Sequence, residues 1–229
     1  MPTIRVLTYN VRSMRDDRAA LGRVISSVEP DIVLVQEAPR FLRWRSLCGQ
    51  LARRAGMVVV SGGRPAAANL VLSSLGVDTV STHDVLFSKD AGLHQRGAAL
   101  AVLSYRGVQF AVAGTHLDLK EQARLRHVGE LHAAIEKYVP TGTPTIVAGD
   151  MNCRPSSAPW EALAAQRADA FAVAGVGSAW TSSAADPRQT IDGIFVDPRL
   201  TVAKAEVVQH QDAALASDHL PVVAEIELA

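Results

Sequence analysis

Cysteine is scarce in this chain, which has only Cys48 and Cys153 among its 229 residues. Two cysteines are too few for a disulfide framework, and their spacing is not that of a zinc site. The sequence also lacks an apolar run of about eighteen residues, so no segment of it is expected to span a membrane. Residues 1–10 lack the charged and then apolar pattern of a signal peptide. We therefore expect a cytoplasmic protein with reduced thiols.

Net charge is absent as well, because 23 Lys and Arg residues balance 23 Asp and Glu residues. A chain without excess positive charge lacks long-range attraction to nucleic acid, so we expect no strong binding to duplex DNA. The charge is unevenly distributed, since residues 1–54 contain ten arginines and five acidic residues. The arginines between Arg40 and Arg54 predict a basic helix. A solvated helix face is preferred here over a patch for nucleic acid or lipid headgroups.

The apolar residues recur in patterns that predict both strands and helices. Hydrophobic residues make up 48% of the chain and charged residues 20%, as in globular proteins, and the length fits one domain over residues 1–229. Strands are predicted at 4–8, 31–36, 57–60, 69–73, 77–86, 98–104, 108–115, 145–148, 193–196 and 221–227, and helices at 21–28, 41–51 and 120–139. Long irregular loops are predicted at 153–160 and 175–191. This order of elements predicts a layered α/β protein.

Two of the predicted helices carry reactive residue types on their apolar stripes. Cys48 shares a stripe with Phe41 and Leu51, which favours a buried apolar role over a reactive thiol. His132 lies on the stripe of helix 120–139, next to Val128, and is predicted to be a core residue. No role is predicted for the histidines that lack a polar motif around them, namely His83, His94, His127 and His210.

Polar residues lie at the ends of six predicted strands. These segments are Thr8-Tyr9-Asn10, Gln36-Glu37, Thr115-His116-Leu117-Asp118, Gly149-Asp150-Met151-Asn152, Ile191-Asp192 and Ser217-Asp218-His219. Each segment by itself is explained equally well as a turn or a solvated loop. Together they supply carboxylates for a hard divalent cation, an Asp-x-Asn pair to orient water, and two histidines to stabilise charge. In layered α/β folds, sites form where strand ends converge, so this set predicts metal-assisted hydrolysis of a phosphate ester.

These six segments resemble, in the same order, the motifs of the endonuclease/exonuclease/phosphatase superfamily. That superfamily includes secreted deoxyribonucleases, sphingomyelinases and inositol-polyphosphate phosphatases. The resemblance extends from residue 8 to residue 221, almost the whole chain. It implies a four-layer α/β/β/α sandwich with two packed mixed sheets and a site at one end of the paired sheets.

The resemblance implies a divalent-metal site. Glu37 matches the main ligand of a Mg²⁺ or Mn²⁺ ion, with Asn10 and Asp218 close to that ion or to a second one. Carboxylate and amide oxygens suit a hard cation of this kind, which usually also binds the phosphate of the substrate.

The resemblance also implies catalytic roles. Asp150 matches the group that orients or deprotonates the attacking water, and Asn152 matches the residue that holds its geometry. His219 matches an imidazole beside the scissile phosphate, with Asp192 as the carboxylate that fixes its tautomer. His116 matches a second histidine that donates to the phosphoryl oxygens as negative charge develops.

Two further positions match phosphate-contacting residues. Arg96 precedes a predicted strand where family members often contact phosphate, although an ordinary surface arginine fits the pattern equally well. Asn69 matches an amide that some branches place beside the phosphate. The chain departs from the nucleolytic branches at Gly193, where an aromatic residue is frequent, at Thr190, where a basic residue is frequent, and at 64–69, which lacks a tyrosine.

We therefore predict a divalent-metal-dependent phosphoesterase, acting as a phosphodiesterase or phosphomonoesterase. The expected substrate is a small molecule, a lipid headgroup or a short nucleic acid, and the expected state is a monomer. A nuclease that uses the same site is the first alternative. A catalytically silent binding domain is the second, which the presence of Glu37, Asp150 and His219 disfavours.

Overall fold

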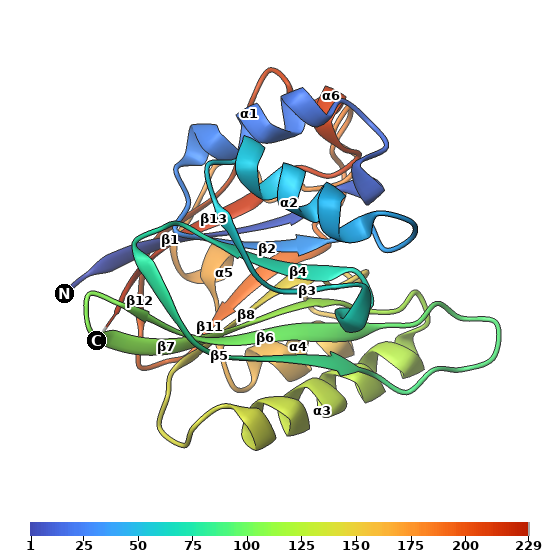
Figure 1. Ribbon diagram of the computed structural model, residues 1–229. Coiled ribbons are helices and arrows are strands. Elements are labelled where there is room, and N and C mark those ends of the chain that lie inside the picture. Colours follow the sequence, from blue (N-terminus) through green and yellow to red (C-terminus); the bar gives the residue numbers. More distant parts are fainter. Residues whose placement is uncertain (229) are drawn as a thin grey trace.

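The computed structural model describes residues 1–228 and contains two β-sheets that pack face to face between layers of helices (Figure 1). The seven-stranded sheet has the order β10-β12-β13-β1-β2-β4-β3. Its strands are β10 (Gly175–Val176), β12 (Thr201–Val207), β13 (Val222–Glu227), β1 (Thr3–Asn10), β2 (Ile32–Gln36), β4 (Asn69–Ser73) and β3 (Val58–Gly63). β1 pairs in parallel with β2 and antiparallel with β13, so this sheet is mixed.

The six-stranded sheet has the order β5-β6-β7-β8-β11-β9. Its strands are β5 (Val77–Leu86), β6 (Gly97–Tyr105), β7 (Val108–His116), β8 (Thr145–Asp150), β11 (Asp192–Val196) and β9 (Ala168–Asp169). β7 pairs in parallel with β8, whereas β11 pairs antiparallel with β8. The four-layer sandwich with two mixed sheets that the sequence implied is therefore confirmed.

The helices form the two outer layers. Helices α1 (Arg18–Val28), α2 (Trp44–Arg54) and α6 (Ala213–Ala216) lie outside the seven-stranded sheet, and α3 (Glu121–Tyr138) and α4 (Ala158–Ala164) lie outside the six-stranded sheet (Figure 1). The short helix α5 (Ala170–Ala174) contacts β11 of one sheet and β12 of the other. Among the described residues, no helix is long and apolar enough to cross a membrane.

Three apolar cores separate the four layers, and alternation along the central strands supplies them. In β2, Ile32 and Leu34 point into the core between the sheets, whereas Val33 and Val35 pack under α1 and α2. Each central strand is buried on both faces, which explains why these strands are apolar throughout rather than alternating with polar residues. Cys48 is buried in the core under α2, and burial raises the pKa of its thiol to about 11, as expected for an apolar role.

Several element predictions were wrong. Helix α2 begins at Trp44, so Phe41 lies outside it and is 77% exposed. The strand β12, which lies next to the short edge strand β10, was missed because its residues form no continuous apolar run. Helix α4 begins at Ala158, inside the loop predicted at 153–160, and continues to Ala164.

The buried face of α3 also differs from the predicted stripe. His127 is buried there, with its Nε2 atom 3.0 Å from the Ser88 carbonyl oxygen, whereas His132 is only half-buried. The helix sequence allows two overlapping stripes, and only the packed sheet selects between them. The prediction that His132 is a core residue was therefore wrong.

Gly193 in β11 leaves space that an aromatic residue from another element fills. A Cβ atom at Gly193 would lie 2.7 Å from Cη2 of Trp160, which is itself buried. Trp160 packs edge-on against Phe195 with ring centroids 5.1 Å apart, and its Nε1 donates to Asp169. The absence of an aromatic residue at position 193 is thus matched by Trp160 of α4.

This packing predicts that Gly193→Ala destabilises the fold. Because Trp160 is held on several sides, the added methyl group should lower the free energy of unfolding by about 1–3 kcal/mol. Gly129→Ala is the matched control, since nothing lies within 4 Å of its Cβ position on the exposed face of α3. That change should be neutral or stabilising by about 0.5–1 kcal/mol. Denaturant unfolding measures both, and equal stability of the two variants would contradict the proposed packing.

Candidate active site

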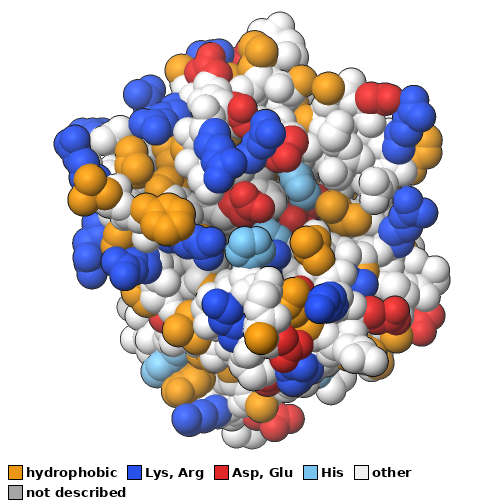
Figure 2. All heavy atoms as spheres, turned by 90° about the vertical axis from the view of Figure 1, so that its right-hand side faces the viewer, with side chains coloured by type: hydrophobic (Ala, Val, Ile, Leu, Met, Phe, Trp, Pro, Cys, Tyr) orange, Lys and Arg blue, Asp and Glu red, His pale blue; other side chains and the backbone are white. Residues whose placement is uncertain are grey.

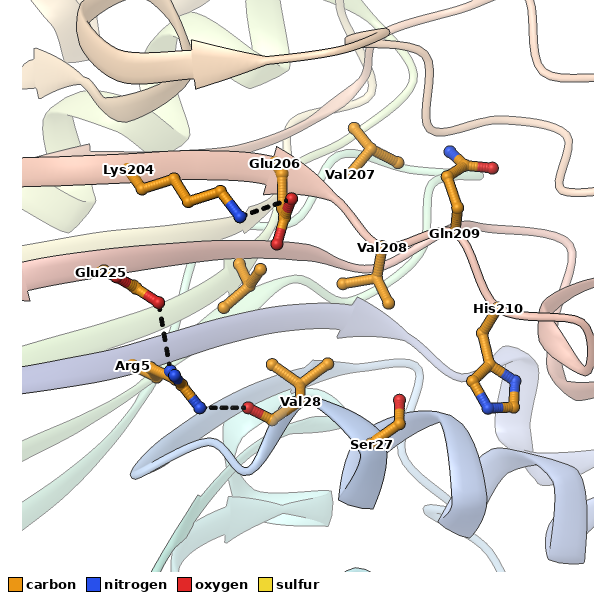
Figure 3. Close-up of a pocket in the computed structure, with 11 residues that line it drawn as sticks. Arg5, Ser27, Val28, Lys204, Glu206, Val207, Val208, Gln209, His210 and Glu225 are labelled. Atoms are coloured by element: carbon orange, nitrogen blue, oxygen red, sulfur yellow. Dashed lines mark hydrogen bonds and ion pairs between the residues drawn. The ribbon is translucent and has the colours of Figure 1, made fainter.

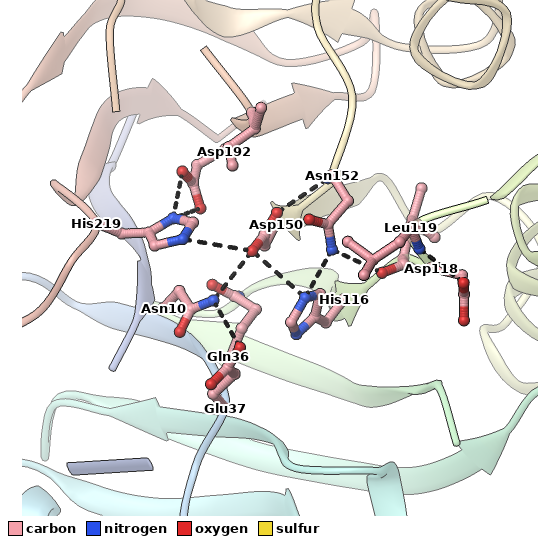
Figure 4. Close-up of polar contacts among 12 residues, drawn as sticks. Asn10, Gln36, Glu37, His116, Asp118, Leu119, Asp150, Asn152, Asp192 and His219 are labelled. Carbon is pink, nitrogen blue, oxygen red and sulfur yellow. Dashed lines mark hydrogen bonds and ion pairs between the residues drawn. The ribbon is translucent and has the colours of Figure 1, made fainter. Parts of the chain in front are cut away.

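The polar strand ends converge at one end of the paired sheets. Asn10 ends β1 and Glu37 follows β2 in one sheet, while His116 ends β7 and Asp150 ends β8 in the other (Figure 4). Figure 2 shows acidic and histidine side chains at a hollow in the middle of this face, with Lys and Arg side chains around it. Residues far apart in the sequence are therefore brought to one place, as the strand-end pattern predicts.

The carboxylate of Asp150 lies at the centre of this cluster. Its Oδ2 atom accepts a hydrogen bond from Asn10 Nδ2 at 3.0 Å and lies 3.4 Å from His116 Nε2 and 3.8 Å from His219 Nε2. Its Oδ1 atom accepts a 2.9 Å hydrogen bond from the backbone amide of Asn152. Since Asp150 is only 2% exposed, these contacts hold its carboxylate in one orientation.

His219 forms a buried pair with Asp192. Its Nδ1 atom lies 2.9 Å and 3.1 Å from the two carboxylate oxygens of Asp192, so Nδ1 carries a proton that it donates. Burial lowers the pKa of His219, but the neighbouring carboxylates, Asp192 foremost, outweigh burial and raise it to about 10. The ring is therefore positively charged at neutral pH, with the Nε2 proton facing Asp150.

His116 differs from His219 in protonation. Asn152 Nδ2 donates to the Leu117 carbonyl oxygen at 3.0 Å and lies 2.9 Å from His116 Nε2. Because an amide nitrogen can only donate, His116 Nε2 must accept and the ring is neutral. Burial lowers the pKa of His116 to about 3, although Asp150 opposes this shift. Donation from His116 to a substrate would therefore come from Nδ1.

Two adjacent sets of side chains contain possible ligands for a divalent cation. In the first, Asn10 Nδ2 donates to Glu37 Oε1 at 3.4 Å, while Asn10 Oδ1, the atom that could bind a metal, accepts from the Arg12 backbone amide at 3.0 Å. Ligand atoms of Asp150, Asp192 and His219 also lie within 4.8 Å of one another. Of the two sets, the one around Glu37 suits a hard cation better, because His219 is charged and its Nδ1 is already used by Asp192.

Asp218 lies at the rim rather than inside the cluster. Its side chain is 44% exposed, with Oδ2 3.4 Å from the Nε atom of Arg12. The preceding residue, Ser217, is buried and donates from Oγ to the Asn10 carbonyl oxygen at 2.7 Å. This bond connects the segment between α6 and β13 to the end of β1 and so positions Asp218 and His219.

The structure places the two predicted phosphate-contacting residues differently. Arg96 is not an ordinary surface arginine, because its side chain is only 11% exposed and lines a cavity with Glu37 and His116. Asn69 is fully buried, and its Nδ2 donates to the carbonyl oxygens of Ala66 and Gly97. The Nδ2 group of Asn69 is thus bonded inside the chain and is not brought into the cluster around Asp150, and its contact with phosphate stays a prediction.

Thr181 positions the site but was not found from the sequence. It is fully buried, and its Oγ1 accepts hydrogen bonds from the backbone amides of Ile191 and Asp192 at 3.2 and 3.3 Å. The next residue, Ser182, forms a bridge with His219. Because Thr181 lies in a segment predicted as an irregular loop, no periodicity marks it, and only the folded chain shows that it orients Asp192.

A model of the Endonuclease/Exonuclease/phosphatase family matches residues 7–219. The chain therefore belongs to this family, whose members are metal-dependent phosphoesterases, and it is an enzyme of that class. A comparison with curated protein sequences found no match.

Solved structures share the fold over the full length of the chain. An endonuclease/exonuclease/phosphatase from Bacteroides vulgatus has a TM-score of 0.84 at 22% identity, with 100% of both chains covered. The Bacteroides thetaiotaomicron mannosyl-6-phosphatase has a TM-score of 0.82 at 18% identity, covering 98% of this chain and 100% of that one. D. rerio TDP2, in complex with a single-strand DNA product, has a TM-score of 0.74 at 16% identity, covering 99% and 100%.

The role of Thr181 can be tested without an activity assay. Thr181→Val keeps the shape but removes the acceptor of two buried amides, which should lower the free energy of unfolding by about 1–3 kcal/mol. Hydrogen exchange of the Ile191 and Asp192 amides should become at least about tenfold faster. Thr141→Val, at an exposed position, is the matched control and should change neither quantity. Unchanged exchange at both amides in Thr181→Val would show that the hydroxyl does not hold this segment.

Proposed function

We propose that the chain hydrolyses small phosphate esters in a reaction that requires Mg²⁺ or Mn²⁺. The observation that carries the proposal is the cluster around Asp150, where one buried carboxylate contacts Asn10, His116 and His219. A fixed carboxylate beside a charged imidazole is the arrangement that in-line attack by water on phosphorus needs, because one group orients the nucleophile and the other stabilises charge.

Glu37 and Asn10 would hold the divalent ion in this proposal, with Asp218 near the rim of the same site. The Glu37 carboxylate supports it, since carboxylate oxygens are ligands of hard cations, whereas Asn10 would have to turn its Oδ1 atom from the Arg12 amide to the ion. The Glu37 backbone has a positive φ of 51°, a conformation that turns its side chain sharply at the end of β2. The chemistry that such an ion supplies when bound is polarisation of a phosphoryl oxygen.

The side chains of the cluster then have separate tasks. Asp150 accepts a proton or a hydrogen bond from the attacking water, and the Asn152 amide fixes the orientation of its carboxylate. His219, charged and aligned by Asp192, donates from Nε2 to the phosphoryl group as negative charge develops. His116 is neutral and lies on the opposite side of Asp150, where its Nδ1 proton is the remaining donor.

Two features of the sequence favour a small ester over duplex DNA. The chain departs from the nucleolytic branches at Thr190, at Gly193 and at 64–69, and its net charge is zero. The fold alone does not choose between a phosphomonoester and a phosphodiester, since the neighbours include a mannosyl-6-phosphatase and a protein bound to a DNA product.

Metal dependence is the first consequence. The purified chain should hydrolyse at least one member of a panel of aryl phosphomonoesters, aryl phosphodiesters, inositol phosphates, sphingomyelin, short RNA and plasmid DNA when Mg²⁺ or Mn²⁺ is present. EDTA should abolish the activity, and excess Mg²⁺ should restore it. Preferred cleavage of DNA or RNA would support the nuclease alternative. Inactivity on the whole panel with metal would support a silent binding domain and contradict the proposal.

Side-chain removal is the second consequence. Asp150→Asn and His219→Ala should each lower kcat at least about a hundredfold, because each removes a group that acts on the reacting atoms. Asp186→Asn and His210→Ala are the matched controls, since both residues lie outside the cluster and should keep wild-type rates. Circular dichroism verifies that all four variants fold. Retention of more than a tenth of the wild-type kcat by Asp150→Asn would contradict the assigned role.

A further inference from the structure

A small cationic cavity adjoins the cluster on the side of the β2–α2 connection. It has a volume of about 200 Å³ and is lined by three arginines, Arg15, Arg40 and Arg96, and by His94. Glu37 and His116 belong to its wall, whereas the other members of the catalytic cluster do not line it. The cavity is therefore continuous with the site of hydrolysis but extends beyond it.

The positive charges of this cavity are not matched by partners in the chain. Among residues 1–228, the side chains of Arg15 and Arg40 form no ion pair or hydrogen bond, and Arg40 only stacks near the Phe41 ring at 5.4 Å. Arg96 has a buried Nε atom without a hydrogen-bond partner, and among residues 1–228 only Asp118 brings a carboxylate oxygen as close as 4.0 Å to it. Glu37 supplies the one carboxylate in the lining.

Holding these groups together is unfavourable in the absence of a bound anion. Burial lowers the pKa of the Arg96 guanidinium; nearby carboxylates oppose this shift and Arg40 adds to it. The buried Nε atom of Arg96, which has no hydrogen-bond partner, costs free energy that an oxyanion can offset through a charge-assisted hydrogen bond. The unpartnered Nε atom of Arg96, in a cavity that Arg15 and Arg40 also line, therefore favours an anionic ligand there.

In a second cavity the positively charged side chains form ion pairs within the chain. This cavity, of about 530 Å³, lies between α1 and strands β12 and β13 (Figure 3). Its cations are paired, since Arg5 Nε lies 3.2 Å from Glu225 and Lys204 Nζ lies 2.9 Å from Glu206. The cavity beside the catalytic cluster differs in this respect from this larger cavity.

We propose that the cavity lined by Arg15, Arg40, Arg96 and His94 binds a second anionic group of the substrate, next to the phosphate ester that is hydrolysed. The inference rests on the proposed function and narrows it to compact esters that carry two phosphates, or a phosphate and a carboxylate. Phe41 is 77% exposed at the rim, where its ring can cover the organic part of such a substrate.

The dimensions favour a compact substrate over a nucleic-acid strand. At about 30 Å³ per water molecule, 200 Å³ holds one oxyanion with a few waters. A neighbouring cavity shares Arg40 and Phe41 and adds Trp44 and Arg64, which is where a longer strand would continue. Substitution of Arg64 therefore separates the two cases.

Calorimetric titration with two unreactive anions tests the proposal on the full chain. The probes are methylphosphonate and methylenebisphosphonate, with Mg²⁺ in large excess so that chelation leaves its free concentration unchanged. The wild type should bind the bisphosphonate at least about tenfold more tightly, and Arg40→Ala or Arg15→Ala should reduce that ratio at least about fivefold, because each removes a charge-assisted contact to the second group. Arg45→Ala is the matched control: Arg45 stacks on Trp44, outside this cavity, and its loss should leave the ratio unchanged.

Several outcomes would overturn the proposal. Equal affinity of the wild type for the two probes, absence of binding, or an unchanged ratio in both arginine variants would each do so. A short single-stranded oligonucleotide that binds more tightly than the bisphosphonate, and that loses affinity in Arg64→Ala, would assign the cavity to a nucleic-acid track instead. The titration needs no turnover, so a failure of the proposed hydrolysis is recognised separately, as binding without activity.

Discussion

The hydrogen bond from Asn10 Nδ2 to Asp150 Oδ2 joins the two halves of the site. Asn10 ends β1 in the seven-stranded sheet and Asp150 ends β8 in the six-stranded sheet, so this 3.0 Å contact crosses the sandwich. The core between the sheets is apolar, and a non-directional core does not by itself align polar groups at its end. The amide therefore sets where Glu37 and His219, which flank strands of the seven-stranded sheet, meet Asp150 and His116 of the six-stranded sheet.

The two histidines show how one carboxylate can serve neighbours in opposite protonation states. Both rings lie within 4 Å of Asp150, yet His219 is also paired with Asp192 whereas His116 accepts from the Asn152 amide. A cation and a neutral ring on two sides of one carboxylate divide the tasks that phosphate hydrolysis requires. Position alone does not decide the protonation of a histidine; the hydrogen-bond partners of its ring nitrogens do.

The ends of the central strands could be predicted from the sequence. Both faces of these strands are buried, so each strand is apolar until the first polar residue, which marks its end. The polar residues at strand ends identified Glu37, Asp150 and Asp192. The resemblance carried by these same strand ends also implied the two mixed sheets. Helix faces and loops were less predictable. The choice between His127 and His132 depends on how α3 is rotated against its sheet, and the burial of Asn69 depends on the carbonyls of Ala66 and Gly97. Thr181 acts through backbone amides, which leave no side-chain pattern to recognise.

The net charge of zero does not show that the arginines of residues 1–54 lie in different structural settings. Arg53 and Arg54 lie in the last turn of α2, where positive charge favours the helix terminus, and Arg54 also packs against Gly22 of α1. Arg40 precedes the helix and faces the catalytic end of the sandwich. A single basic segment of sequence thus has one end that packs in α2 and one end that lines the cavity beside Glu37 and His116. A count of charges does not separate these two ends, because the boundary between them lies at Trp44, where α2 begins.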